Sequence, residues 1–209
     1  TANSSFGNAA AVLVGDFVYS RSFQMMTELH SLRIMEVLAE CTNTIAEGEV
    51  MQLANIGRLD LSEDDYRTII NAKTAKLFEA AAHSAALLSP APAPHRDAQI
   101  VALKRYGQAL GLAFQLVDDS LDYAGDAAAL GKNVGDDLAE GKLTLPLIVA
   151  LRDGDEATRQ VVREALSKKD ASALAAVQAA LQTCDALGYT QRAAEREIAS
   201  AKAALEVLP

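Results

Sequence analysis

The chain has 209 residues, of which 50% are hydrophobic and 22% are charged, a composition typical of a globular protein with a sizeable core. Its net charge of −9 argues against nucleic acid or an anionic membrane surface as the main partner, because both bind basic patches. The sequence has no apolar run of about 18 residues, as a membrane span would need. Its two cysteines, Cys41 and Cys184, are far apart and indicate no disulfide framework. We therefore expect one cytoplasmic domain over residues 1–209.

Both ends of the sequence resemble the interior of a longer one. The chain starts at Thr1 rather than at a methionine, and it stops at Pro209 where a turn begins. We expect the domain to be incomplete at its N-terminus and also at its C-terminus.

Apolar residues recur at intervals of three and four along the chain, and strand-type alternation is nearly absent, so the predicted fold is all-α. Ser62, followed by three acidic residues, is a good start for a helix. The proline-rich segment 89–94 and the Gly- and Asp-rich segment 125–140 interrupt the helical pattern. The predicted helices are 6–26, 32–54, 62–88, 96–123, 143–152, 155–166, 171–187 and 191–207.

The predicted helix 96–123 carries a stripe of acidic residues. Asp118, Asp119 and Asp122 lie within about one turn, near the helix C-terminus, where the helix dipole disfavours anions. At about 6 Å, two such charges repel by roughly 3 kcal/mol at an effective dielectric near 20. A solvated acidic face is one interpretation. The other is a Mg²⁺ site, since Mg²⁺ prefers carboxylate oxygens and no His or Cys lies near to bind zinc.

An apolar stripe on the same helix is predicted to be buried. It consists of Leu103, Gly107, Leu110, Phe114, Val117 and Leu121.

A lysine occupies a core-facing position of the predicted helix 62–88. Lys73 falls within the apolar face that Ile69, Ile70, Leu77, Phe78 and Ala81 form. Either its stem covers apolar surface while its ammonium group reaches water, or it lines a polar cavity. Because the hydroxyl of Thr74 is adjacent, we interpret the pair as one wall of an anion site.

The segment 131–146 supplies two further lysines. Gly131, Gly135 and Gly141 permit turns that return Lys132 and Lys142 toward the acidic helix. This pattern predicts a phosphate-binding loop. It is not the nucleotide-binding P-loop, because the G-x-x-x-x-G-K-[ST] pattern and its preceding strand are missing.

Three features together resemble motifs of the trans-isoprenyl diphosphate synthases: Lys73 with Thr74, the sequence FQLVDDSLD at 114–122, and the segment 131–146. The motif sequences are most similar to those of the long-chain octaprenyl type. The segments VGDFVYS at 14–20, IAEGE at 45–49 and KTAKLFE at 73–79 extend the resemblance along the chain. It implies an all-α isoprenoid-synthase bundle around a central hydrophobic tunnel, and a homodimer.

The resemblance also implies a reaction. An allylic diphosphate held by Mg²⁺ ionises, isopentenyl diphosphate attacks the allylic cation, and a proton is lost. The implied product is a long-chain polyprenyl diphosphate for quinone side chains, which is delivered to the membrane.

Site roles follow from the resemblance position by position. The ligands of Mg²⁺ would be Asp118, Asp119 and Asp122, with Asp137 as an outer-shell partner of metal-bound water. The cations that hold the diphosphate would be Lys73, Lys132 and Lys142. Thr74 and Gln115 would form a polar pair facing the developing cation. Electrostatic stabilisation of the departing diphosphate would dominate catalysis.

One departure from the family pattern leaves alternatives open. The family's first Asp-rich motif, its two arginines and much of the isopentenyl diphosphate site would lie upstream of Thr1. The alternatives are a catalytically incomplete or regulatory subunit of a prenyl synthase, and a class I terpene cyclase with similar metal motifs. Lys73 with Thr74 and the segment 131–146 favour chain elongation. A helical scaffold without ligands would leave Lys73 and the three acids unexplained.

Overall fold

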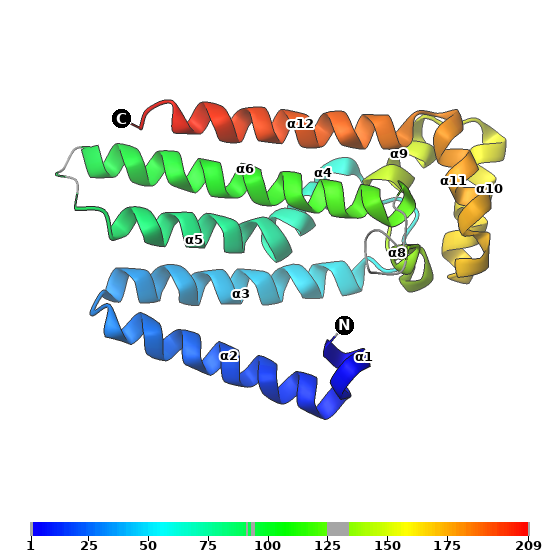
Figure 1. The fold of residues 1–209 in the computed structure, drawn as a ribbon. Helices are drawn as coiled ribbons and strands as arrows, with labels where there is room; N and C mark the ends of the chain where they lie inside the picture. Colours follow the sequence, from blue (N-terminus) through cyan, green and yellow to red (C-terminus); the bar gives the residue numbers. More distant parts are fainter. Residues whose placement is uncertain (1, 91, 93–94, 125–133, 209) are drawn as a thin grey trace. The chain divides into compact units, whose positions relative to one another are not determined.

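The computed structural model describes residues 2–90, 92, 95–124 and 134–208. The chain forms two compact units, residues 1–40 and 41–209. The described residues contain helices and no strand, which confirms the predicted all-α class (Figure 1). No described helix is both long enough and apolar enough to cross a bilayer.

The first unit contains α1 (Ala2–Phe6), α2 (Asn8–Glu28) and the beginning of α3 (Leu32–Ala54). Gly7 separates α1 from α2 with a φ of 80°, a backbone conformation that glycine adopts without steric cost. The predicted helix 6–26 therefore begins at a helix junction, and its C-terminal end extends to Glu28. The predicted bounds of the helix 32–54 are confirmed.

In the second unit, the helix predicted at 62–88 has three parts. They are α4 (Glu63–Ile70), the π-helical segment η1 (Asn71–Ala75) and α5 (Lys76–Leu87). Ser62 is the N-cap of α4, because its hydroxyl accepts the backbone N–H of Asp65 and the Asp65 carboxylate accepts the backbone N–H of Ser62. The predicted start of this helix is thus confirmed.

The π-helical segment makes the predicted apolar face wrong. A π-turn holds more residues than an α-turn, so the helix faces before and after η1 are out of phase. Ile69 and Ile70 precede η1 and are buried, whereas Leu77 and Ala81 follow it and are exposed. The buried side chains of α5 are Ala80, His83 and Ala86.

Two glycines let neighbouring helices approach the backbone of η1. A Cβ added at Gly48 of α3 would lie 2.6 Å from the backbone N of Lys73. A Cβ at Gly111, in α6 (His95–Ala124), would lie 2.5 Å from the Cα of Ala75. Since neither position has room for a side chain, these contacts hold the backbone that carries Lys73 and Thr74 between α3 and α6.

The predicted buried stripe of α6 is wrong in part, because Phe114 is 56% exposed and Val117 is 38% exposed. Gly107 is buried, and Leu103, Leu110 and Leu121 are half-buried. In Figure 1, α6 lies between α5 and α12 (Ala186–Leu205), and both helices contact it. Close packing on two sides favours small residues, so the buried set differs from the apolar stripe. It includes Ala102, Gly107, Ala109, Gly111, Ala113, Gln115, Leu116 and Asp119.

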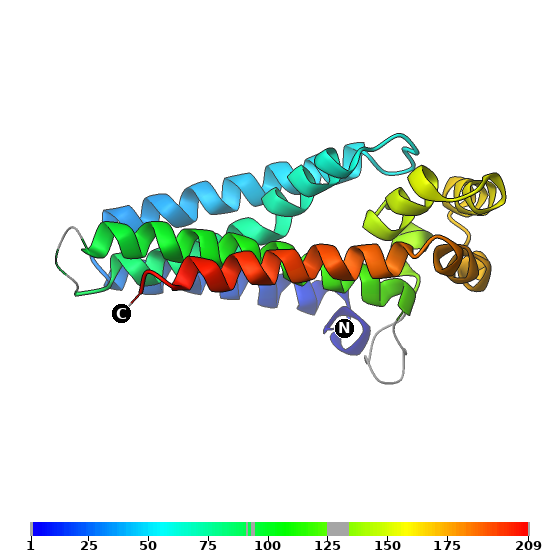
Figure 2. The same ribbon diagram turned by 90° about the horizontal axis from the view of Figure 1, so that it is seen from above.

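The C-terminal part of the second unit consists of shorter helices (Figure 2). They are α8 (Asp136–Glu140), α9 (Leu145–Asp153), α10 (Glu156–Lys168), the 3₁₀ turn η2 (Ala171–Ala173) and α11 (Leu174–Thr183), followed by α12. α8 falls within the segment predicted as a break. The helix predicted at 171–187 ends early and α12 begins at Ala186 rather than at 191, because Asp185 takes a left-handed φ of 51°.

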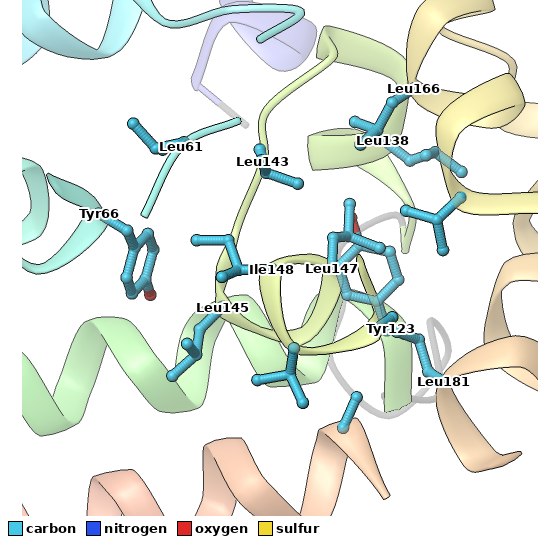
Figure 3. Packing of buried hydrophobic residues seen from close by; sticks show 14 of the residues in the cluster. Leu61, Tyr66, Tyr123, Leu138, Leu143, Leu145, Leu147, Ile148, Leu166 and Leu181 are labelled. Atoms are coloured by element: carbon cyan, nitrogen blue, oxygen red, sulfur yellow. The ribbon is translucent and has the colours of Figure 1, made fainter. Parts of the chain in front are cut away.

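The core of the second unit surrounds α9. Six consecutive residues from Leu145 to Ala150 are buried, and Tyr123, Leu138, Leu166 and Leu181 belong to the same cluster (Figure 3). Each large apolar side chain buried here contributes about 1.5–3 kcal/mol of hydrophobic stabilisation. This cluster fixes the C-terminal end of α6, which carries the acidic residues, next to α8.

A polar junction connects α4, α9 and α12. The carboxylate of Glu63 accepts hydrogen bonds from Arg67 Nε (3.3 Å), Arg152 Nη1 (3.0 Å) and Tyr189 Oη (2.8 Å). Burial raises the pKa of Glu63, but the bonds from Tyr189, Arg152 and Arg67 outweigh burial and hold this pKa below its ordinary value of 4.5. The ionised form of Glu63 is therefore favoured by folding.

We expect Glu63→Gln to lower the free energy of unfolding by about 1–2 kcal/mol at pH 7. Because the folded-state pKa is depressed, this stabilisation is complete above the unfolded-state pKa and is lost as the pH falls below 4.5. Urea unfolding at pH 7 and at lower pH measures both effects. Glu164→Gln, at an exposed acid paired within α10, is the control and should change little. A difference that is the same at all pH values would contradict the prediction.

Candidate functional site

A cavity of about 30 Å³ in the second unit collects the polar residues of α4, η1, α6 and the segment that precedes α9. Its polar wall includes Gln52, Tyr66, Lys73, Asp119, Asp137, Lys142 and Thr144. A space of this size holds one or two water molecules. Two of the predicted lysines and two of the predicted acids therefore share one cavity.

Asp119 lies at the end of a chain of side-chain hydrogen bonds. Its Oδ1 accepts Gln115 Nε2 at 2.6 Å, and its Oδ2 accepts the Tyr66 hydroxyl at 2.6 Å. The Thr74 hydroxyl in turn donates to Gln115 Oε1 at 2.7 Å. The structure thus joins the predicted polar pair, Thr74 and Gln115, directly to one of the three acids.

Burial, together with the charge of the nearby Asp137, raises the pKa of Asp119 from its ordinary value of 3.8 to about 7. The hydrogen bonds from Tyr66 and Gln115 and the charge of Lys73 oppose this shift. Two carboxylates in a low-dielectric cavity favour an additional cation there.

Asp122 faces a different partner. Its two carboxylate oxygens accept the backbone N–H groups of Asp136 (3.3 Å) and Asp137 (3.1 Å) at the start of α8. Its own backbone carbonyl accepts the N–H of Gly135. Burial and the charge of Asp137 raise the pKa of Asp122. Asp122 therefore anchors the segment that brings Asp137 and Lys142 to the cavity.

Lys142 pairs with Asp137 at 3.4 Å and also with Glu140. Burial raises the pKa of Asp137, and the charges of Lys142 and Lys73 oppose this effect. Gly135 and Gly141 have φ values of 82° and 76°, so the turns predicted at these two positions are confirmed. Gly131 and Lys132 lie outside the described residues.

Lys73 lies in the wall of the cavity with Ile69 and Ile70, as its place on the apolar face indicated. It makes no ion pair within 4 Å with any residue that the structure describes, yet its charge acts on Asp119 and Asp137. Its binding of an anion remains a prediction.

The side chains around the cavity have the chemistry that hydrated Mg²⁺ and phosphate require, although the cavity itself has room for only one or two water molecules. In the described parts of the chain, no three Asp, Glu, His or Cys side chains converge to hold a metal ion by themselves. Mg²⁺ commonly takes one or two protein carboxylates and completes its shell with water and phosphate oxygens. The Oε1 of Gln52 is buried and has no hydrogen-bond partner, so it could accept a hydrogen bond from a metal-bound water.

Two residues of this site, Tyr66 and Gln52, were not among those predicted from the sequence. Tyr66 lies seven residues before Lys73, and this spacing places both on one helix face, so the sequence carried a signal for it. Gln52 is a single polar residue in a mixed helix, and nothing in its local pattern sets it apart.

A family model for polyprenyl synthetases matches residues 1–184. The chain belongs to the polyprenyl synthetase family. Octaprenyl diphosphate synthase of Escherichia coli K12 is 50% identical to it over 210 residues, which cover the whole chain and 64% of that protein. An all-trans-nonaprenyl-diphosphate synthase of Rhodobacter capsulatus is 42% identical and is covered to 63%. These matches confirm the resemblance seen in the sequence.

Solved polyprenyl synthases share the fold of this family member. A polyprenyl synthase from Caulobacter crescentus, solved with calcium and isoprenyl diphosphate, superposes with a TM-score of 0.91 at 40% identity, over all of this chain and 63% of that one. A decaprenyl diphosphate synthase from Rhodobacter capsulatus superposes with a TM-score of 0.86 at 43% identity. The chain spans about 64% of the length of the curated octaprenyl synthase that it matches.

Proposed function

We propose that the protein is a trans-prenyltransferase that condenses an allylic prenyl diphosphate with isopentenyl diphosphate to form a long-chain, octaprenyl-type polyprenyl diphosphate for quinone side chains. The observation that carries this proposal is the meeting of Lys73, Lys142, Asp119 and Asp137 in one cavity of a polyprenyl synthetase chain. The 50% identity to an octaprenyl diphosphate synthase supports the long-chain class.

The residues of the cavity are proposed to have two roles, binding of the diphosphate and stabilisation of the charges that form in the reaction. Lys73 and Lys142 would hold the diphosphate of the allylic substrate and stabilise the charge that it gains as the allylic C–O bond breaks. The Thr74 and Gln115 oxygens would face the allylic cation until isopentenyl diphosphate supplies the electron pair of the new C–C bond and a proton is lost. Lys132, outside the described residues, is proposed as a third cation at the diphosphate.

Magnesium would neutralise the leaving diphosphate when bound. Asp118, Asp119 and Asp122 are the proposed protein side chains at the metal, and Asp137 is proposed to orient metal-bound water beside Lys142. The structure supports a share of this set, since Asp119 and Asp137 line the cavity, while Asp118 is half-buried one residue away. We also propose a single domain with a hydrophobic tunnel, a cytoplasmic homodimer and delivery of the apolar product to the membrane.

The test is an elongation assay. The purified protein, incubated with farnesyl diphosphate, labelled isopentenyl diphosphate and Mg²⁺, should yield products that grow in five-carbon steps, and chelation of Mg²⁺ should stop their formation. Mass spectrometry of the products measures their length. A cyclised hydrocarbon formed without isopentenyl diphosphate would indicate a terpene cyclase instead. Activity that appears only after addition of a second protein would indicate a regulatory subunit.

A further inference from the structure

Tyr66 is a buried tyrosine whose hydroxyl points at the acidic helix. It is 3% exposed and lies beside Leu61 in the core of the second unit (Figure 3). It also lines the same cavity as Lys73. Its hydroxyl donates to Asp119 Oδ2 at 2.6 Å across 53 residues of sequence. A buried tyrosine hydroxyl requires a partner, and here the partner is a carboxylate that is itself 3% exposed.

The other oxygen of Asp119 is held from the opposite side. Gln115 Nε2 donates to Oδ1 at 2.6 Å, and the amide of Gln115 has a fixed orientation because its oxygen accepts the Thr74 hydroxyl. The carboxylate of Asp119 thus receives one donor on each oxygen. Because a carboxylate has about four acceptor positions, lone pairs remain free on both oxygens.

We propose that Tyr66 is a positioning residue that fixes the carboxylate of Asp119 so that its remaining lone pairs face the cavity shared with Asp137, Lys73 and Lys142. This inference rests on the proposed function, in which the side chains around that cavity bind a magnesium diphosphate. Without the hydroxyl, Asp119 Oδ2 would be a buried oxygen with one donor fewer, and the carboxylate would turn toward Lys73, the cation that acts on it. Both side chains would then be less available to the ligand.

Tyr66→Phe removes one oxygen atom and keeps the ring in the core. We expect the Mg²⁺ concentration for half-maximal thermal stabilisation by inorganic pyrophosphate to rise by about 10-fold or more, as loss of an outer-shell hydrogen bond to a metal ligand commonly causes. The melting temperature without ligands should fall by a few degrees at most. Both quantities come from melting curves of the purified protein over a series of Mg²⁺ concentrations.

Tyr189→Phe is the matched control. It removes a hydrogen bond of the same kind, from a tyrosine hydroxyl to a carboxylate, because Tyr189 donates to Glu63 at 2.8 Å outside the cavity. The control should lose stability without a shift of the Mg²⁺ midpoint. In an Asp119→Asn background, Tyr66→Phe should add little, since the proposed effect passes through Asp119.

The possible results distinguish a failure of the positioning role of Tyr66 from a failure of the proposed prenyltransferase function. A wild-type protein that gains no Mg²⁺-dependent stabilisation with pyrophosphate would overturn the proposed function, and the inference with it. A wild-type response that Tyr66→Phe retains at the same Mg²⁺ concentration would overturn the inference alone. If Tyr66→Phe fails to fold while Tyr189→Phe folds, the hydroxyl serves the fold itself and the positioning role is equally overturned.

Discussion

Lys73→Met is expected to lower turnover by about 100- to 1,000-fold while the protein still folds. Lys73 is half-buried in the wall of the cavity, and methionine fills much of the volume of the lysine stem without its charge. The variant would lose a cation at the departing diphosphate. It would also remove a positive charge that favours the ionised forms of Asp119 and Asp137. Steady-state kinetics of chain elongation, together with a melting curve, measure the two effects separately.

Lys76→Met is the matched control for this experiment. Lys76 lies three residues further along, is half-buried in an ion pair with Glu79 and is absent from the cavity wall. Its replacement should leave turnover within about twofold because Lys76 does not line the cavity, and the melting curve measures any stability that is lost with its pair to Glu79. Equal turnover in wild type and Lys73→Met would contradict the role of Lys73 at the diphosphate. It would favour the alternative interpretation, in which the stem of Lys73 covers apolar surface and its ammonium group is solvated.

Gly111→Ala is expected to destabilise the protein by about 1–3 kcal/mol, although alanine is by about 1 kcal/mol the better helix former. The added Cβ would lie 2.5 Å from Ala75 Cα and 3.0 Å from Ala75 Cβ. Because the opposing atoms belong to backbone and to a short side chain, no flexible group can move aside. α6 and η1 would separate, and the hydrogen bond from Thr74 to Gln115 would lengthen.

Urea unfolding measures this loss, and Gln108→Ala supplies the reference on an exposed face of the same helix. That substitution removes only a surface hydrogen bond to Asn71 and should change stability by about 0.5 kcal/mol or less. A Gly111→Ala protein that is more stable than wild type would show that α6 does not approach η1 this closely.

The helical periodicity predicted where most helices lie, because three- and four-residue spacing depends on local burial. The helix 32–54 followed directly from it, and the start of α4 followed from Ser62 and the acidic residues after it. Periodicity failed where backbone geometry departed from 3.6 residues per turn, at η1, and where a non-glycine residue, Asp185, took a left-handed conformation. Neither the π-helical segment nor the left-handed Asp185 has a local amino-acid composition from which it could have been predicted.

Several residues of the site were predicted from the sequence, but Tyr66, Gln52 and the pairings between residues were not. Like-charge crowding pointed to Asp118, Asp119 and Asp122, yet it could not show that Asp119 faces Tyr66 while Asp122 caps the start of α8. Those partners are 53 and 15 residues away in sequence, so packing and not local pattern selects them. The buried face of α6, which consists mostly of small residues, was mispredicted for the same reason, because it is set by close packing against α5 and α12, two alanine-rich helices.

The π-helical segment η1 makes chain length itself a determinant of the site. Removing one residue between Asn71 and Ala75 would allow a regular α-helix, and regularity would be locally favourable. Because the π-turn accommodates its extra residue within nearly the same rotation, the deletion would leave the faces of α4 and α5 largely in place, but it would shift the side chains between Asn71 and Ala75, which include Lys73 and Thr74. Along this stretch side chains can be exchanged one at a time, but a single deletion would move Thr74 away from Gln115 while Tyr66 keeps its place beside Asp119.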